Sequence, residues 1–410
     1  MPIKSESHRF SLFILLLTIF LDWMSIGLVY PMFSSMIFDQ GTHFFSIETS
    51  DVVRGTWLGI LLAAGPLAQF LSSPIVGTLS DQKGRKPLLK NTLLIIILGY
   101  LLCAFGVFAE SLLLLLIGRL IVGVGTGNVA AVYAAIADIS KPEEKAKHFG
   151  LASMSSGIGF TLGPFLGGAL SSWGFAAPFL FSSVFSLINL ILLIFWFSET
   201  HHIRRNVQLS LTLGLKNLKK AFQVPALRAL FLSFFFFCAG WSFYWEFIPV
   251  TWIQEYHLDP SQVGNFYAYG AAFYAVSSGL LIRPIVNRFQ PLPVLFISLI
   301  LLSISIFPLL FHSNVTIFWW YIPIQQFLAA LVFPTGTTIV SNSVKEDSQG
   351  EIMGILQSVD SFAFASSPLL AGLFVGVSTQ APIIVAGVFM LLASLVLLSS
   401  YRKKLFTGGK

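Results

Sequence analysis

Residues 77–86 read GTLSDQKGRK and join two apolar stretches, residues 56–79 and 90–109. Each stretch is about 20 residues long, the length at which an α-helix crosses the hydrocarbon core of a bilayer. The joining segment carries the acid Asp81 between two glycines, Gly77 and Gly84, among several basic residues. This part of the sequence therefore predicts two membrane-spanning helices with a short charged turn between them.

The same alternation of apolar blocks and charged turns continues along all 410 residues. Hydrophobic residues make up 55% of the chain and charged residues only 10%, and the mean hydropathy is +0.82. A soluble domain carries about 25% charged residues, because its surface faces water. The composition excludes a soluble enzyme, a nucleic-acid-binding protein and a disordered chain, despite the net charge of +6.

Twelve spans are predicted in all. The first six are 10–35, 56–79, 90–109, 112–138, 149–171 and 175–198, and the second six are 227–253, 263–286, 293–312, 316–342, 351–376 and 381–400. Each should be a helix, because backbone hydrogen bonds inside a bilayer must close within the segment. The predicted fold class is an all-α membrane protein with twelve transmembrane helices.

Lysine and arginine fall almost entirely into alternate loops, on the same side as both ends of the chain, whereas Arg54 alone falls on the other side. Cytoplasmic loops carry an excess of these residues. We therefore expect a multi-pass protein of the plasma membrane, the inner membrane of a bacterium, with both termini in the cytoplasm.

The chain divides into two sets of six spans, residues 1–198 and 227–410, joined by a hydrophilic linker, 199–226, with a basic amphipathic segment at 209–222. The halves resemble each other. Gly163-Pro164 and Gly167-Gly168 recur as Ser367-Pro368 and Ala371-Gly372 at one constant offset. Paired repeats of this kind are typical of secondary transporters, whose substrate site lies between them.

Four ionisable side chains fall well inside predicted spans: Asp22, Arg119, Glu246 and Asp360. Each costs about 2.5–3.5 kcal/mol on insertion and is by default a functional candidate. We interpret the carboxylates as sites for a proton or a cationic substrate. The alternatives are a structural Asp22–Arg119 ion pair, a water-exposed Glu246, and a packing hydrogen bond from Asp360.

The loop at 77–86 resembles the signature loop of the major facilitator superfamily. The residues that carry the resemblance are Gly77, Asp81, Gly84, Arg85 and Lys86. It implies that the acid caps a helix of the other half, and that Arg85 pairs with an acid at the end of the fourth span, here Asp138.

Three further segments resemble proton-coupled members of this superfamily. Arg119 is followed by Gly123, Gly125 and Gly127, and the fifth span carries an antiporter-like signature in Gly159, Gly163, Pro164, Gly167 and Gly168. The resemblance implies that this signature bends the fifth span and seals it against the eighth. Residues 21–31, LDWMSIGLVYP, and residues 137–151 are similar to the tetracycline-type drug/proton antiporters.

The resemblance implies alternating access between two six-helix halves, with Asp22 as the proton-carrying acid and Arg119 adjusting its proton affinity. Spans 1, 4, 7 and 10 line the substrate path in the family. They offer Asn128, Tyr133, Trp241, Tyr244, Trp245, Gln325 and Gln326. Aromatic rings with a few carboxylates suit an amphipathic, neutral or cationic molecule, although rings at these positions can also face lipid.

The sequence thus predicts a proton-coupled exporter of drugs or amphipathic compounds, acting as a monomer. We expect small-molecule substrate, protons and bilayer lipid as its partners, and neither a cofactor nor a metal ion nor enzymatic activity. Two alternatives stay open: a carrier for one metabolite, such as a siderophore, in either direction, and a receptor that has lost transport.

Overall fold

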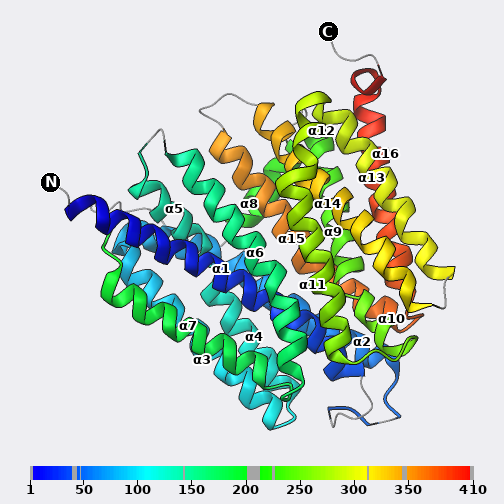
Figure 1. Cartoon of the computed structure of the whole chain (residues 1–410), viewed down its shortest axis with the longest axis horizontal. Helices are drawn as coiled ribbons and strands as arrows, with labels where there is room; N and C mark the ends of the chain where they lie inside the picture. Colours follow the sequence, from blue (N-terminus) through cyan, green and yellow to red (C-terminus); the bar gives the residue numbers. More distant parts are fainter. Residues whose placement is uncertain are drawn as a thin grey trace. The chain divides into compact units, whose positions relative to one another are not determined.

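The computed structural model describes residues 3–38, 44–46, 48–141, 144–200, 213–223, 227–311, 314–343 and 349–406. These residues are almost entirely helical, and they contain no strand (Figure 1). The α-helices are α1 (Ile3–Phe38), α2 (Asp51–Lys83), α3 (Arg85–Phe108), α4 (Leu112–Thr126), α5 (Val129–Ile139), α6 (Lys145–Ser171), α7 (Ala177–Trp196), α8 (Leu213–Gln223), α9 (Arg228–Trp245), α10 (Ile248–Gln254), α11 (Pro260–Val276), α12 (Ile282–Arg288), α13 (Pro291–Ile306), α14 (Phe318–Asn342), α15 (Gln349–Val375) and α16 (Ala381–Phe406). A π-helical turn, η1 (Ser277–Leu281), and two short 3-10 helices, η2 (Phe307–Phe311) and η3 (Val315–Ile317), complete the set.

Among the described residues, 11 helical segments are long and apolar enough to cross a membrane. The remaining predicted span, 263–286, consists of α11, η1 and α12 in direct succession. Pro284 in α12 has no backbone N–H to donate to the preceding turn, and η1 is a single π-turn within a helix, the form in which the rare π-helix mostly occurs. The prediction of an all-α membrane protein is confirmed.

Two of the spans are broken once. Residues 112–138 form α4 and α5, which separate at Gly127 and Asn128, and residues 227–253 form α9 and α10, which separate at Glu246 and Phe247. Asn128 and Glu246 are both candidate site residues. Membrane transporters commonly place their binding groups at such breaks, where backbone groups are released from the helix.

The described chain forms two compact units. The first includes α1 up to Met36 and residues 64–200, and the second includes residues 45–63 and the chain from Gly214 onward. In the first unit α3 packs against α4 and α7 (Figure 1). In the second unit α9 packs against α15 and α16, and α13 against α14 and α16. These units have other boundaries than the predicted division into halves 1–198 and 227–410 with the linker 199–226. That division stays a prediction.

The first part of α2 belongs to the second unit because it meets α15 at glycine. A Cβ atom on Gly55 would lie 2.4 Å from the carbonyl oxygen of Gly372, and one on Gly59 would lie 2.3 Å from that of Pro368. Both distances are too short for a real side chain. The two helix backbones can touch here only because small residues face each other, as is usual between membrane helices.

The glycines of the fifth predicted span pack against α1 within the first unit. Cβ atoms on Gly159, Gly163 and Gly167 would lie 2.2–2.4 Å from carbonyl oxygens of α1. Pro164 contacts Gly27 of α1, and Gly168 is buried. The implied seal against the eighth span remains a prediction.

The linker contributes the short helix α8, whereas residues 201–212 and 224–226 lie outside the described part of the chain, including the start of the predicted amphipathic segment. Gly214 and Ala221 are buried, and Asn217 donates a hydrogen bond to Ser358 of α15 at 3.3 Å. Leu215 and Phe222 are about half exposed, at 50% and 53%. α8 therefore contacts α15 through Asn217 and carries two apolar side chains that are about half exposed in the described chain.

Candidate functional site

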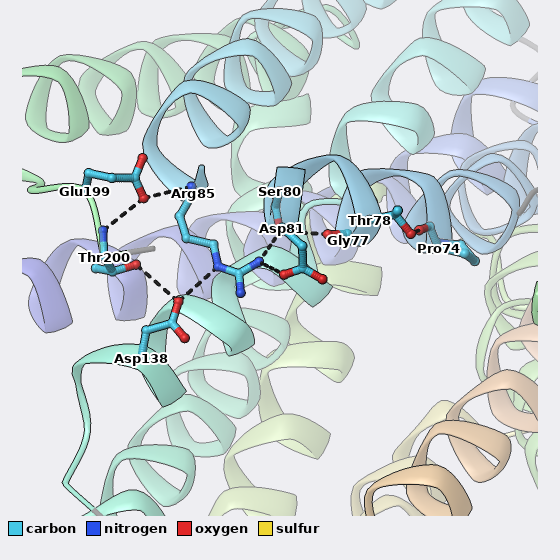
Figure 2. Close-up of polar contacts among 9 residues, drawn as sticks. All are labelled: Pro74, Gly77, Thr78, Ser80, Asp81, Arg85, Asp138, Glu199 and Thr200. Carbon is cyan, nitrogen blue, oxygen red and sulfur yellow. Dashed lines mark hydrogen bonds and ion pairs between the residues drawn. The ribbon is translucent and has the colours of Figure 1, made fainter. Parts of the chain in front are cut away.

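Arg85 organises the charged turn between α2 and α3 (Figure 2). Its guanidinium is almost fully buried and contacts Asp138 at the end of α5 (Nε to Oδ2, 3.1 Å) and Asp81 one turn earlier (Nη1 to Oδ1, 2.6 Å). It also donates to the Ser80 hydroxyl, which in turn donates to the Gly77 carbonyl at 2.8 Å. The structure thus brings Arg85 and Asp138 together. The capping role implied for Asp81 in the other half remains a prediction.

Glu199 completes this cluster, and sequence reasoning missed it. Its carboxylate accepts hydrogen bonds from the backbone N–H groups of Arg85 (2.9 Å) and Thr200 (2.9 Å), as Figure 2 shows. It also accepts one from the backbone N–H of Lys86 (3.1 Å), at the first turn of α3. An anion at this position is favoured by the helix dipole and by the otherwise unpaired N–H groups. Gly84 has φ +99°, and a Cβ on it would lie 2.5 Å from Glu199 Oε2. Glycine is therefore required there on two counts.

Lys86 and Thr200 tie the same cluster to the end of α7. The Lys86 ammonium donates to the carbonyl of Ile194 at 2.9 Å. The Thr200 hydroxyl lies 3.5 Å from Asp138 Oδ2 (Figure 2). The ends of α2, α3, α5 and α7 are thus held at one point by charge-assisted hydrogen bonds, which are the stronger kind.

Asp22 lies in the middle of α1 and is only 5% exposed. Its carboxyl faces Asn128 at the break between α4 and α5, and it is close to Tyr100 of α3. Within the described chain, Asp22 Oδ2, the Tyr100 hydroxyl and both amide atoms of Asn128 make no hydrogen bond of standard geometry, although the Asp22 carboxyl lies close to Asn128 and the Tyr100 hydroxyl lies close to Ser25. Buried polar atoms without partners are rare and usually have a functional reason.

Arg119 is 3% exposed. It contacts α1 at Phe33, closer to the end of the helix than Asp22. Its guanidinium lies 5.4 Å from the ring of Phe33 and against Gly65 of α2. Phe33 follows Asp22 by eleven positions, or about 16 Å along a helix that rises 1.5 Å per residue. Tyr100, another residue that the sequence analysis missed, lies near both Asp22 and Arg119.

The glycines that follow Arg119 allow close helix approach. A Cβ on Gly123 would meet the Gly65 carbonyl at 2.3 Å, one on Gly125 the Thr92 carbonyl at 3.0 Å, and one on Gly127 the Ser72 hydroxyl at 2.3 Å. These contacts fix α4 against α2 and α3, and so hold Arg119 in place.

In the second unit, Glu246 is 3% exposed and accepts a hydrogen bond from Ser242 at 3.0 Å, so it is not simply a water-exposed group. Asp360 of α15 lies 3.5 Å from the thiol of Cys238. A thiol is a weak donor, so this contact satisfies the carboxylate only poorly.

The predicted substrate-contacting residues of this unit fall into two groups. Tyr244 donates to Gln325, whose amide donates to the Ser305 carbonyl at 3.2 Å. The rings of Trp241 and Trp245 stack at 5.6 Å with an interplanar angle of 10°. In the first unit, Tyr133 is half-buried and stacks on Phe149 at 6.0 Å.

An all-helical chain with many membrane-length segments, broken helices and buried intramembrane charges is a polytopic membrane transporter by architecture. The chain belongs to the Major Facilitator Superfamily, which it matches over residues 15–237 and 230–406. It is therefore a multi-pass membrane transporter of small molecules and not an enzyme.

Several characterised proteins resemble the chain over most of its length. It is 29% identical to the tetracycline resistance protein, class C, of Escherichia coli over 372 residues, 88% of each chain. It is 28% identical to the quinolone resistance protein NorA of Staphylococcus aureus over 393 residues, 92% of each. A third relative, the class H tetracycline resistance protein of Pasteurella multocida, is 38% identical over 191 residues, 46% of this chain and 45% of the relative.

Two solved structures share the fold. The D-xylose–proton symporter superposes with a TM-score of 0.77 at 15% identity, covering 94% of this chain and 96% of the symporter. The human organic anion transporter MFSD10 (TETRAN) superposes with a TM-score of 0.70 at 22% identity, covering 95% and 99%. At these identities the likeness concerns the fold alone.

Proposed function

We propose that this protein is a proton-coupled secondary active transporter that exports drugs or other amphipathic organic compounds, neutral or cationic, by alternating access. The names of its relatives, which are tetracycline and quinolone resistance proteins, support the substrate class and the direction. The helix breaks at Asn128 and Glu246 support binding groups inside the membrane.

The observation that carries the proton coupling is the buried Asp22 carboxyl. An intramembrane acid whose Oδ2 makes no hydrogen bond of standard geometry within the described residues, close to Asn128 and Tyr100, suits a group that gains and loses a proton. Each proton that crosses 100 mV releases about 2.3 kcal/mol. Since about 1.4 kcal/mol corresponds to a tenfold concentration ratio, one proton supports a substantial gradient of a neutral cargo.

The proposal includes the orientation. The basic loops would face the cytoplasm of a bacterium, with both termini there and the Arg85 cluster at the cytoplasmic surface of the inner membrane. In this arrangement Asp22, Arg119, Glu246 and Asp360 lie along the transport path, and the protein acts as a monomer.

The test is transport into inverted membrane vesicles with an imposed pH gradient, using tetracycline and the lipophilic cation tetraphenylphosphonium as cargo. Asp22→Asn should abolish gradient-driven uptake and leave cargo exchange without a gradient. Asp259→Asn is the matched control, because Asp259 caps α11 outside the spans and asparagine caps equally well. Equal gradient-driven uptake by the parent and Asp22→Asn would remove Asp22 from the coupling mechanism.

A further inference from the structure

The polar side chains contributed by α9 and α14 differ in whether their hydrogen bonds are made. The Tyr244 hydroxyl donates a hydrogen bond to the Gln325 amide oxygen, and the Gln325 amide nitrogen donates one to the Ser305 carbonyl. Their neighbours Trp245 and Gln326 are as deeply buried, at 4% and 3% exposure. Yet Trp245 Nε1 and Gln326 Nε2 have no acceptor within the described chain.

These two side chains meet at one point of a third helix. A Cβ atom on Gly270 of α11 would lie 3.0 Å from Cη2 of Trp245, on the six-membered ring of the indole, and 3.3 Å from Gln326 Nε2. Glycine at this position lets the indole and the amide approach the α11 backbone together. The two side chains from α9 and α14 therefore belong to one local cluster.

The Trp245 ring is held in its orientation, so its N–H cannot easily turn toward a protein acceptor. One face stacks on Trp241 at 5.6 Å, and Tyr267 packs edge-on against the ring at 4.7 Å and 89°. Tyr267 also donates its hydroxyl proton to the Trp245 carbonyl, which fixes the adjoining backbone.

Both unpartnered atoms are donors, and this identifies the chemistry that would satisfy them. An indole nitrogen and an amide nitrogen only donate, and leaving either buried without an acceptor costs about 1–3 kcal/mol. A ligand oxygen would recover this cost. The buried carboxylate of Glu246 follows Trp245 directly in the chain, so a neutral carbonyl oxygen is favoured over an anionic one.

We propose that the Trp245 indole N–H and the Gln326 amide N–H bind a carbonyl oxygen of the transported molecule. The assignment rests on the proposed function, since it takes α9 and α14 as walls of the cargo path. It divides cargo into two classes: carbonyl-bearing compounds held by these donors, and cations without an oxygen acceptor that bind independently of them.

The test is equilibrium binding to the purified full chain in lipid nanodiscs, without any gradient. Tetracycline and a quinolone are the carbonyl-bearing probes, and tetraphenylphosphonium is the probe without an acceptor. Trp245→Phe keeps an aromatic ring and removes the N–H, and Gln326→Met removes the amide at similar length. Each should weaken binding of the carbonyl probes about threefold to tenfold and change tetraphenylphosphonium binding less than twofold.

Trp252→Phe is the matched control. Its indole nitrogen is also without an acceptor in the described chain, but its ring is enclosed by Phe266 at 5.0 Å and Phe318 at 5.5 Å. Its removal should leave the binding of all probes unchanged. Unchanged carbonyl binding in Trp245→Phe and Gln326→Met, an equal loss of both probe classes, or an equal effect of Trp252→Phe would each overturn the proposal.

The outcome for the parent protein separates this inference from the proposed function. A parent that binds tetraphenylphosphonium but neither carbonyl probe overturns the carbonyl assignment and leaves drug export standing. A parent that binds none of the three probes contradicts drug export, and the carbonyl assignment falls with it.

Discussion

Two polar clusters in the first unit, one around Arg85 and one around Asp22, are built on opposite principles. The Arg85 guanidinium has two carboxylates and a hydroxyl as partners, and the Glu199 carboxylate accepts from the backbone N–H groups of Arg85, Lys86 and Thr200. Around Asp22 several buried polar atoms have no partner within the described residues. A satisfied network holds helices together, whereas an unsatisfied one costs stability and is retained for what it binds. Mutations in the two clusters should therefore change stability in opposite directions.

The largest effect is expected from Arg85→Met. It leaves Asp81 and Asp138 without their shared cation and removes a buried side chain that joins α2, α3 and α5. We expect a loss of about 2–3 kcal/mol, less than the 3–5 typical of fully buried pairs, because the side chains of Asp81 and Asp138 are 41% and 26% exposed. Denaturant titration of the purified protein in mixed micelles measures this loss.

Lys86→Met is the control for this change. Its ammonium makes one exposed hydrogen bond, to the Ile194 carbonyl, so its loss should cost well under about 1 kcal/mol. Equal stability of Arg85→Met and the parent would mean that the cluster is not structural, and the contrast with Asp22 would fail.

Next in size is a pair of identical substitutions with opposite expected signs. Tyr100→Phe removes a buried hydroxyl without a partner and should raise the free energy of unfolding by about 1 kcal/mol. Tyr267→Phe removes a buried hydroxyl that donates to Trp245 and should lower it by a similar amount. The same titration compares them, and a loss of stability in both would show that the Tyr100 hydroxyl has a partner in solution.

Tyr100→Phe should also reduce transport. The hydroxyl lies near both Asp22 and Arg119, so we expect its removal to slow pH-gradient-driven uptake by about tenfold or more, within the range of positioned proton-transfer groups. Uptake into inverted vesicles measures this rate. An unchanged rate would restrict the coupling to Asp22 itself and make Tyr100 a packing residue.

The fold could be predicted much more fully than the clusters. Apolar length and loop charge predict the spans, because the bilayer constrains each helix separately. The π-turn at Ser277–Leu281 left no comparable signal. Glu199 was missed because its partners are 114 and 113 positions away in the chain, and Tyr100 because a tyrosine in an apolar span looks like core. Arg85 and Asp138 were named together only through the family resemblance.

A smaller effect is expected from Glu199→Gln, which tests the newly found member of the Arg85 cluster. Glutamine keeps one acceptor oxygen but removes the negative charge at the start of α3 and at least one of the three backbone hydrogen bonds that the carboxylate accepts. The expected loss is about 1 kcal/mol, and it should shrink at high salt, which screens the interaction with the helix dipole. Denaturant titrations at low and high ionic strength measure both quantities, and a loss that does not depend on salt would assign the effect to packing.

The smallest predicted effect lies outside both clusters, at the contact between α8 and α15. Asn217→Ala removes one partly buried hydrogen bond to Ser358, so we expect a loss of about 0.5 kcal/mol or less in the free energy of unfolding. Because this bond attaches α8 to α15, proteolysis of the linker should nevertheless become faster. Lys219→Ala, on the exposed side of α8, is the control for a general effect on helix formation. Faster cleavage in Asn217→Ala alone would show that α8 is attached through α15, whereas equal cleavage in both would leave its exposed apolar face as the main attachment, through the lipid surface.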